Sequence, residues 1–315
     1  MHLIVPFAGP LSEPGRAALR SLVLPRLAQL LAQLGTQQRD DGDAGSFTPP
    51  HERALARALG FAGGDGCLPW AAWHAAADGL VPDDLAWGEI TPAHWHLGTD
   101  QVSLLDPDAL LLDEAGARVL FDAVQELFTS EGFSFVYGAP TRWYAAHEGL
   151  AQLRTASLDR VIGRNVDRWL QGDAADLPSQ AFMRLLRRLQ NEVQMLLYTH
   201  PLNDRRAAQG LLPVNSFWIS GCGVAQPVAG AQPQVDARLR APALADDWAA
   251  WVKAWETLDA GPIAALATAH AAGQPVQLTL CGERSGVTLT AGAGWWQRLR
   301  TRLQRPSALA LLESL

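Results

Sequence analysis

The sequence predicts the α/β class, with a small α+β domain at 85–158 between two flanking segments, 1–84 and 159–315. Three observations lead to this fold class. The chain opens on a short apolar run, "LIVPFAG", which is typical of a buried strand stopped by proline and glycine. Paired strand patterns surround one amphipathic helix in the middle of the chain. Another strand pair follows a series of helical patterns near the end.

The first segment predicts three helices after the opening strand. Leucines at helical spacing, followed by a glycine, predict a helix over 17–34. The polar stretch "DDGDAGSFTPP" at 40–50 predicts a loop, and its closing prolines favour a helix at 51–59 that ends at the next glycine. After the glycine-rich "GFAGGDG", a further helix is predicted at 70–77.

The inserted domain is predicted as a β-β-α-β-β module. "ITPAHWHLG" and "QVSLLD" are predicted strands joined by a Gly-Thr-Asp turn. Asp113 is the predicted N-cap of a helix that runs to Phe128 and has one apolar face. That face consists of Ala117, Leu120, Phe121, Val124 and Leu127. "FSFVYG" and "TRWYAA" form the second predicted strand pair.

The remainder of the chain alternates helices and strands. The longest helical pattern covers 180–200, and a short helix is predicted at 203–209 with Asn203 as its cap. "VNSFWIS" predicts a strand, and the "GCG" after it predicts a turn that leaves the strand. A helix at 246–258 is followed by the strand pair "PVQLTLCG" and "VTLTAG". A basic helix is predicted at 295–304.

Composition excludes several functional classes. The 315 residues are 48% hydrophobic and 18% charged, as expected of a globular protein, and a net charge of −7 argues against a nucleic-acid partner. Cys67, Cys222 and Cys281 lie far apart and contain no CxxC pair, and their odd number offers no even disulfide framework. This fits a reducing compartment and argues against a cysteine-rich zinc site. No basic segment precedes the N-terminal apolar run, and no stretch of about 18 apolar residues occurs. We therefore expect a cytoplasmic protein without a membrane anchor.

The stretch "YTHPLNDRRAAQGLLPVNSFWISGCG" is the densest cluster of polar functional groups. Glycines after a strand let backbone N–H groups approach a ligand, and converging asparagine and arginine side chains suit a phosphate or carboxylate. The predicted ligand-binding residues are Asn203, Arg206, Asn215, Ser220, Gly221 and Gly223. The alternative is structural: the asparagines cap a helix and satisfy a turn, and the glycines serve only the backbone.

Two further motifs have both a functional and a structural interpretation. His94 and His96 are two apart on a predicted strand and so share a face, but no third metal ligand lies nearby in the sequence. Trp248, Trp251 and Trp255 share a helical face, which is more typical of a core than of a stacking platform.

For the predicted C-terminal helix, one hypothesis is a surface that docks a protein partner. It consists of Trp295, Trp296, Arg298, Arg300, Arg302 and Arg305.

On these residues a family resemblance can be stated. "THPLNDRRAAQGLLPVNSFWISGCG" resembles the segment of archaeal-type cofactor-independent phosphoglycerate mutases that has His-Pro-Val-Asn-x-x-Arg, then Pro-Ala-Asn, then Arg-Gly-x-Gly. That family belongs to the alkaline phosphatase superfamily. The resemblance therefore implies that 1–84 and 159–315 form one mixed-sheet, alkaline-phosphatase-like core that is interrupted by the inserted domain. The middle region resembles the small domain inserted in it, with "SLLDPDALLLDEAGARVL" at its Asp-Arg-Arg-Ala-Gly strand and following helix. More closely, the chain resembles proteobacterial proteins described as phosphoglycerate-mutase-like or as Rpf-type regulatory proteins.

The chain departs from the family at the catalytic positions. The family's first strand ends in Asp-Gly, whose Asp binds metal, and Pro6 and Phe7 stand there in this chain. Its nucleophilic Ser and the following Asp fall on His51 and Glu52. The Arg of Arg-Gly-x-Gly is Ser220, and the family's late His…Asp…Gly-His cluster has no counterpart. Since a two-metal phosphoryl-transfer site depends on its ligands, we expect no metal cofactor and no catalytic residue.

These observations favour a degenerate, non-catalytic member of the mutase-like fold with a regulatory cleft. The cleft is expected to bind a small phosphorylated or carboxylate ligand, or a protein partner. One alternative is a phosphomutase or phosphatase that uses Mn²⁺ or Mg²⁺, with His51 as a rearranged nucleophile beside Glu52. Another is an interaction protein that docks through the C-terminal Trp/Arg helix.

Overall fold

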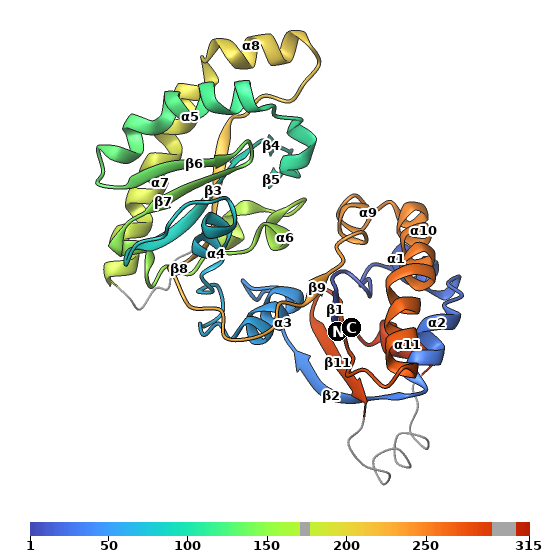
Figure 1. The fold of residues 1–315 in the computed structure, drawn as a ribbon. Helices are drawn as coiled ribbons and strands as arrows, with labels where there is room; N and C mark the ends of the chain where they lie inside the picture. Colours follow the sequence, from blue (N-terminus) through green and yellow to red (C-terminus); the bar gives the residue numbers. More distant parts are fainter. Residues whose placement is uncertain (171–176, 292–306) are drawn as a thin grey trace. The chain divides into compact units, whose positions relative to one another are not determined.

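The computed structural model describes residues 1–170, 177–291 and 307–315 (Figure 1). The chain forms two compact units. The first consists of 1–60 and 229–315, and the second of 61–228. Among the described residues, no helix has the length and apolar composition needed to cross a membrane.

The first unit contains a five-stranded mixed sheet in the order β2-β11-β10-β1-β9. The inner strand β1 (His2–Val5) pairs in parallel with its two neighbours, β10 (Gln277–Cys281) and β9 (Gln234–Val235). Beyond β10, β11 (Ser285–Ala291) and β2 (Leu34–Asp41) continue the sheet in antiparallel pairs. Parallel and antiparallel pairs in one sheet confirm the predicted mixed-sheet α/β class.

Helices cover both faces of this sheet. Leu3 and Val5 face a large apolar core, whereas Ile4 faces α3 (Pro50–Leu59) through Ala54. This alternation follows from the two-residue period of a strand. The large core is closed by residues of α1 (Glu13–Arg20), α2 (Pro25–Leu31), α10 (Trp248–Leu258), the π-helical turn η4 (Asp259–Ile263), α11 (Ala264–Ala271) and α13 (Ala308–Glu313), with α9 (Arg240–Leu244) beside α10.

Two sequence expectations for this unit need comment. Trp251 and Trp255 are fully buried in the core, so the tryptophan stripe is a packing feature, as its helical spacing indicated. The single helix expected over 17–34 is wrong. Pro25 begins a second helix because its missing N–H is not needed at a first-turn position, and Leu34 already belongs to β2.

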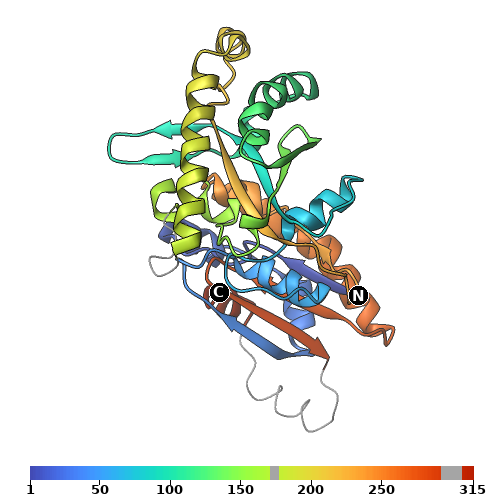
Figure 2. The ribbon, with the colours of Figure 1, turned by 90° about the vertical axis from the view of Figure 1, so that its left-hand side faces the viewer.

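The second unit is built on a four-stranded antiparallel sheet in the order β6-β7-β3-β8. Its strands are β6 (Ser134–Ala139), β7 (Arg142–Ala146), β3 (Ala86–Ala93) and β8 (Ser216–Val224). A separate hairpin, β4 (Trp95–Leu97) with β5 (Val102–Leu104), follows directly after β3. Figure 2 shows this hairpin projecting past α7.

Different helices pack on the two faces of this sheet. Helices α5 (Glu114–Thr129) and α7 (Leu177–Tyr198) pack on one face through an aromatic-rich core (Figure 1). Helix α4 (Trp70–Ala77) packs on the other face against β3 and β8. The remaining short elements are η1 (Pro107–Leu110), η2 (Glu148–Leu150), α6 (Leu158–Val161), η3 (Val166–Trp169) and α8 (Pro201–Ala208).

The compact second unit has wider bounds than the inserted domain expected at 85–158. It begins at Phe61 and ends at Val228. The reason is strand pairing: β8 lies against β3 over seven residue pairs, and α7 covers the same sheet. Segments far apart in sequence therefore build one layer, which local sequence patterns do not reveal.

Two local expectations near α8 and β8 are wrong. His200, rather than Asn203, caps α8, because its ring nitrogen accepts the N–H of Leu202. The "GCG" residues lie inside β8 rather than in a turn that leaves it.

The hypothesis of a C-terminal docking helix, which involves Trp295, Trp296 and the arginines 298–305, concerns residues outside the described part of the chain.

Candidate functional site

The stretch from Tyr198 to Gly223 links the end of α7, α8 and the edge strand β8. Asn203 is buried, and its amide binds main-chain groups at both ends of this linkage. Its Nδ2 donates to the carbonyls of Leu197 (2.8 Å) and Val214 (2.7 Å), and its Oδ1 accepts the N–H of Val214 (2.9 Å). Asn203 therefore fastens the start of β8 to the end of α7.

Arg206 has a similar structural role. Its Nε donates to the carbonyl of Leu212 over 2.9 Å, and its Nη2 donates to the carbonyl of Leu110 at the end of η1. Burial lowers the pKa of the Arg206 guanidinium from its ordinary value. Two main-chain carbonyls thus take up guanidinium donors that were predicted to face a ligand.

The glycines of "SGCG" allow α4 to approach β8 closely. Gly221 has φ 64°, in the left-handed region that favours glycine, and lies at an irregularity in the β3–β8 register. A Cβ at Gly221 would lie 2.8 Å from Cβ of Trp70, and one at Gly223 would lie 3.1 Å from Cβ of Pro69. Ser220 is buried opposite Glu89 of β3. Packing accounts for both glycines, and ligand binding at these three residues stays a prediction.

Asn215 differs from the other predicted residues because it lines a groove. Its side-chain amide binds the main chain of Trp95 twice: Oδ1 accepts the N–H (2.7 Å) and Nδ2 donates to the carbonyl (3.0 Å). The main-chain N–H of Asn215 donates to the carbonyl of Ala93. Asn215 therefore stands where β8 begins and where the β4–β5 hairpin leaves the sheet.

The groove lies between this hairpin and α7, and its volume is about 650 Å³. That is within the size range of ligand sites in proteins. Its lining residues come from the hairpin, the η3 region, α7 and the start of β8. They are Trp95, Leu97, Val102, Asp167, Leu170, Arg187, Gln190, Asn191, Gln194, Tyr198 and Asn215.

Helix α7 presents two different faces to its surroundings. One is a buried apolar stripe, which consists of Leu186, Leu189, Val193 and Leu197. The other faces the groove with polar groups at helical spacing, namely Arg187, Asn191, Gln194 and Tyr198. This second face was not predicted from the sequence, because polar residues on a long amphipathic helix usually face solvent. The sequence signal that could have indicated it is the set of side-chain amides in "LQNEVQMLLY".

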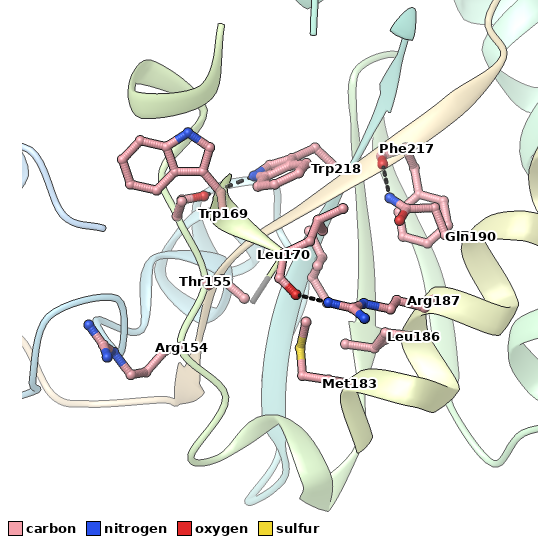
Figure 3. A pocket seen from close by; sticks show the side chains of 12 residues that line it. Arg154, Thr155, Trp169, Leu170, Met183, Leu186, Arg187, Gln190, Phe217 and Trp218 are labelled. Carbon is pink, nitrogen blue, oxygen red and sulfur yellow. Dashed lines mark hydrogen bonds between the residues drawn. The ribbon is translucent and has the colours of Figure 1, made fainter. Parts of the chain in front are cut away.

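A second, smaller pocket shares Arg187 with the groove (Figure 3). Arg187 Nη2 donates to the carbonyl of Leu170 over 2.6 Å, and both residues line both hollows. Gln190 Nε2 donates to the carbonyl of Phe217 over 3.0 Å, as the dashed line in Figure 3 shows. The volume of this pocket is about 20 Å³, which is water-sized, so the larger groove is the candidate ligand site.

The residues proposed for rearranged catalysis lie in the first unit. His51 and Glu52 are in the first turn of α3, and the His51 ring packs on Phe7 with ring centroids 5.5 Å apart. Phe7 has φ 56° although it is not glycine. This left-handed backbone conformation is uncommon for an aromatic residue and favours glycine. The aromatic side chain at Phe7 occupies space beside His51.

The histidine pair of the hairpin does not form a cluster of metal ligands. His94 Nδ1 lies 2.8 Å from the carbonyl of Pro213, and His96 is exposed. Among the described residues, no group of three or more His, Cys, Asp or Glu side chains is placed to hold a metal ion.

A partly buried network of ionisable side chains, which the sequence patterns do not indicate, joins α4 to the sheet. Glu89 Oε2 is 2.6 Å from His74 Nδ1. Next to this pair, Asp78 accepts two hydrogen bonds from Arg142 and one from Tyr144. Tyr144 and Glu89 are directly opposed on β7 and β3, so strand register brings the two groups together. Local sequence patterns contain no such information.

The chain shows limited similarity to known proteins. No family model and no curated protein matches the chain. A cofactor-independent phosphoglycerate mutase from Thermoplasma acidophilum DSM 1728 is similar in structure at 12% identity and a TM-score of 0.40, over 100% of this chain and 98% of that chain. The PH0037 protein from Pyrococcus horikoshii is similar at 14% identity and a TM-score of 0.47, over 95% of this chain and 91% of that chain. Neither likeness assigns an activity to this chain.

Proposed function

We propose that this chain is a non-catalytic, cytoplasmic, mutase-like protein that binds a peptide segment of a partner protein in the groove between α7 and the β4–β5 hairpin. The observation that supports this most is the polar face of α7 turned into that groove. A regulatory role would follow from reversible binding of the partner there.

The chemistry of the groove suits a polypeptide better than a phosphate. The side-chain amide of Asn191 has no hydrogen-bond partner among the described residues, and Gln194 uses only its Nε2, which donates to Ser216 Oγ over 3.1 Å. A primary amide both donates and accepts, as a peptide unit does. In the described part of the chain, the charged lining residues are Arg187 and Asp167, one of each sign, so this lining offers no excess of positive charge to an anion.

Exposed apolar groups at the rim add to this argument. Leu97 on the hairpin is 79% exposed and Tyr198 at the end of α7 is 83% exposed. Large apolar side chains flanking polar hydrogen-bonding groups are typical of interfaces with proteins.

Selection from a display library of random dodecapeptides tests the proposal. The bait is the full chain, compared with the Asn191→Ala/Gln194→Ala double variant. Alanine has a higher helix propensity than either residue, so α7 should stay folded. Met195→Ala is the matched control, because Met195 is exposed on α7 and does not line the groove. Peptides enriched by the wild type and by M195A, but not by the double variant, are expected. No enrichment, or equal enrichment by all three, would overturn the proposal.

The non-catalytic part is tested separately by turnover of phosphoglycerates and p-nitrophenyl phosphate with added Mn²⁺, Mg²⁺ or Zn²⁺. The departures at Pro6, Phe7 and His51 support an absence of turnover. Turnover that disappears in the His51→Ala variant would instead establish the rearranged-nucleophile alternative.

A further inference from the structure

The β4 strand of the groove has an open edge. The partner strand β5 pairs with every second residue along β4. The N–H of Leu105 donates to the carbonyl of His94, the N–H of Gly98 donates to the carbonyl of Gln101, and His96 lies opposite Ser103 between them. In an antiparallel pair the residues between these positions direct their N–H and C=O to the opposite side. Trp95 and Leu97 therefore direct their main-chain groups away from β5.

At Trp95 this edge is closed by a side chain that imitates a strand. The amide of Asn215 exchanges two hydrogen bonds with the N–H and C=O of Trp95. One residue that exchanges both bonds with the residue opposite it is the pattern of an antiparallel ladder. Asn215 thus occupies the position of a single residue in a third strand beside β4.

At Leu97 the edge is open because the chain that leads into β8 turns away. Asn203 binds both main-chain groups of Val214, and His94 contacts the carbonyl of Pro213. These contacts divert residues 213–214 from the line that β8 would follow along β4. No hydrogen bond among the described residues uses the main chain of Leu97.

We infer that the groove binds its peptide as an added antiparallel strand on β4, continuing the ladder that Asn215 begins. This inference rests on the proposed function and specifies its binding mode. One peptide residue exchanges two main-chain hydrogen bonds with Leu97. Natural proteins usually protect open strand edges with charge or proline, whereas this edge carries an exposed leucine beside a groove.

The same geometry specifies the kind of segment that binds. Residues opposed in an antiparallel pair have side chains on the same face. The peptide residue opposite Leu97 therefore points its side chain toward the groove, where Val102 and Tyr198 also lie. The occupant is an extended segment with an apolar residue at this position, and its flanking peptide groups lie within reach of the amides of Asn191 and Gln194. With only two main-chain bonds to β4, the binding should be weak and reversible.

Hydrogen exchange provides the direct test, with the dodecapeptide of highest affinity from the display selection as probe. In the free full-length protein the Leu97 amide should exchange quickly, and saturation with the peptide should slow its exchange at least tenfold. Methylation of the peptide nitrogen opposite Leu97 should weaken binding about tenfold, as the loss of one well-made hydrogen bond predicts. Leu97→Pro, which removes the edge N–H but none of the β4–β5 bonds, should have a similar effect.

Leu97→Ala is the matched variant, since it keeps the main-chain N–H and removes only the apolar side chain. A peptide that binds the groove but leaves Leu97 exchange unchanged, and tolerates methylation at every nitrogen, would overturn strand addition while leaving the peptide-binding function intact. A selection that yields no groove-dependent peptide would overturn the function itself. The two failures are therefore distinguishable.

Discussion

His74 Nδ1 lies 2.6 Å from Glu89 Oε2, and this contact joins α4 to β3, an inner strand of the sheet in the second unit. The Glu89 side chain is 10% exposed and that of His74 is 37% exposed. The carboxylate is thus largely withdrawn from water, and the imidazole bridges it to the surface. Without a hydrogen-bond partner, a buried carboxylate is costly.

Replacement of His74 should therefore destabilise the second unit. His74→Ala is expected to lower the free energy of unfolding by about 1–3 kcal/mol, because Glu89 loses its partner. Urea unfolding followed by circular dichroism measures this change. Adding Glu89→Gln to the variant should restore part of the loss, since a neutral amide is easier to bury. If the double variant were less stable by the full sum of both single changes, the two side chains would not be coupled.

The Asp78 network predicts a specific acid sensitivity. Hydrogen bonds from Arg142 lower the pKa of Asp78 below its ordinary value. The folded carboxyl therefore binds a proton less readily than the unfolded one. Its stabilising contribution is complete above the unfolded pKa of about 3.9 and is lost as the pH falls below that value. Asp78→Asn should flatten this acid limb in urea unfolding at a series of pH values. A limb of unchanged steepness would contradict the assignment.

Tyr144 should show the opposite dependence. Burial raises the pKa of its phenol, and the hydrogen bond that it donates to Asp78 adds to the shift. A raised pKa stabilises the fold below the unfolded value of about 10, and this contribution is lost as the pH rises above it. Tyr144→Phe should cost about 1 kcal/mol at neutral pH and remove this alkaline dependence. Phenolate absorbance from Tyr144 should appear only as the protein unfolds in alkali.

Close packing at Gly221 yields a prediction with a built-in control. Gly221→Ala combines a positive φ with a Cβ contact of 2.8 Å to Trp70, so it should separate α4 from β8 and cost more than about 2 kcal/mol. Gly210 has φ 72°, and no atom lies within 4 Å of the position that a Cβ would take there, so Gly210→Ala measures the backbone cost alone. Equal losses in the thermal midpoints of the two variants would show that packing against Trp70 is not limiting.

Local structure was predictable wherever one short segment determines it. Proline and glycine mark both ends of α3, and Asp113 accepts the N–H of Gly116 at the start of α5, as its position before an apolar stripe predicted. The strand pairs β6–β7 and β10–β11 were likewise predicted, since each pair is local in sequence. Such elements depend on interactions within a few residues.

Predictions that depend on distant partners were less successful. Asparagine is a residue type that often caps helices or binds ligands, yet the Asn203 amide binds the main chain of Leu197 and Val214. These partners follow from the way α7 and β8 meet. The Asn215–Trp95 pair spans 120 residues and depends on the β3–β8 register. The groove between α7 and the hairpin arises from the same long-range pairing. The residue periodicity within α7 or within the hairpin does not predict this groove.

The two asparagines of this stretch should therefore respond differently to the same substitution. Asn203→Ala removes three hydrogen bonds at a buried position and leaves main-chain groups of Leu197 and Val214 unsatisfied, so it should cost about 2–4 kcal/mol in urea unfolding. Asn215→Ala removes two bonds at a half-buried position and should cost about 1 kcal/mol, because water can replace the amide at Trp95. It also frees a second residue on the β4 edge, so a groove-bound peptide should bind at least as tightly as to the wild type. Peptide affinity abolished in a folded Asn215→Ala protein would show that Asn215 contacts the ligand directly rather than closing the edge.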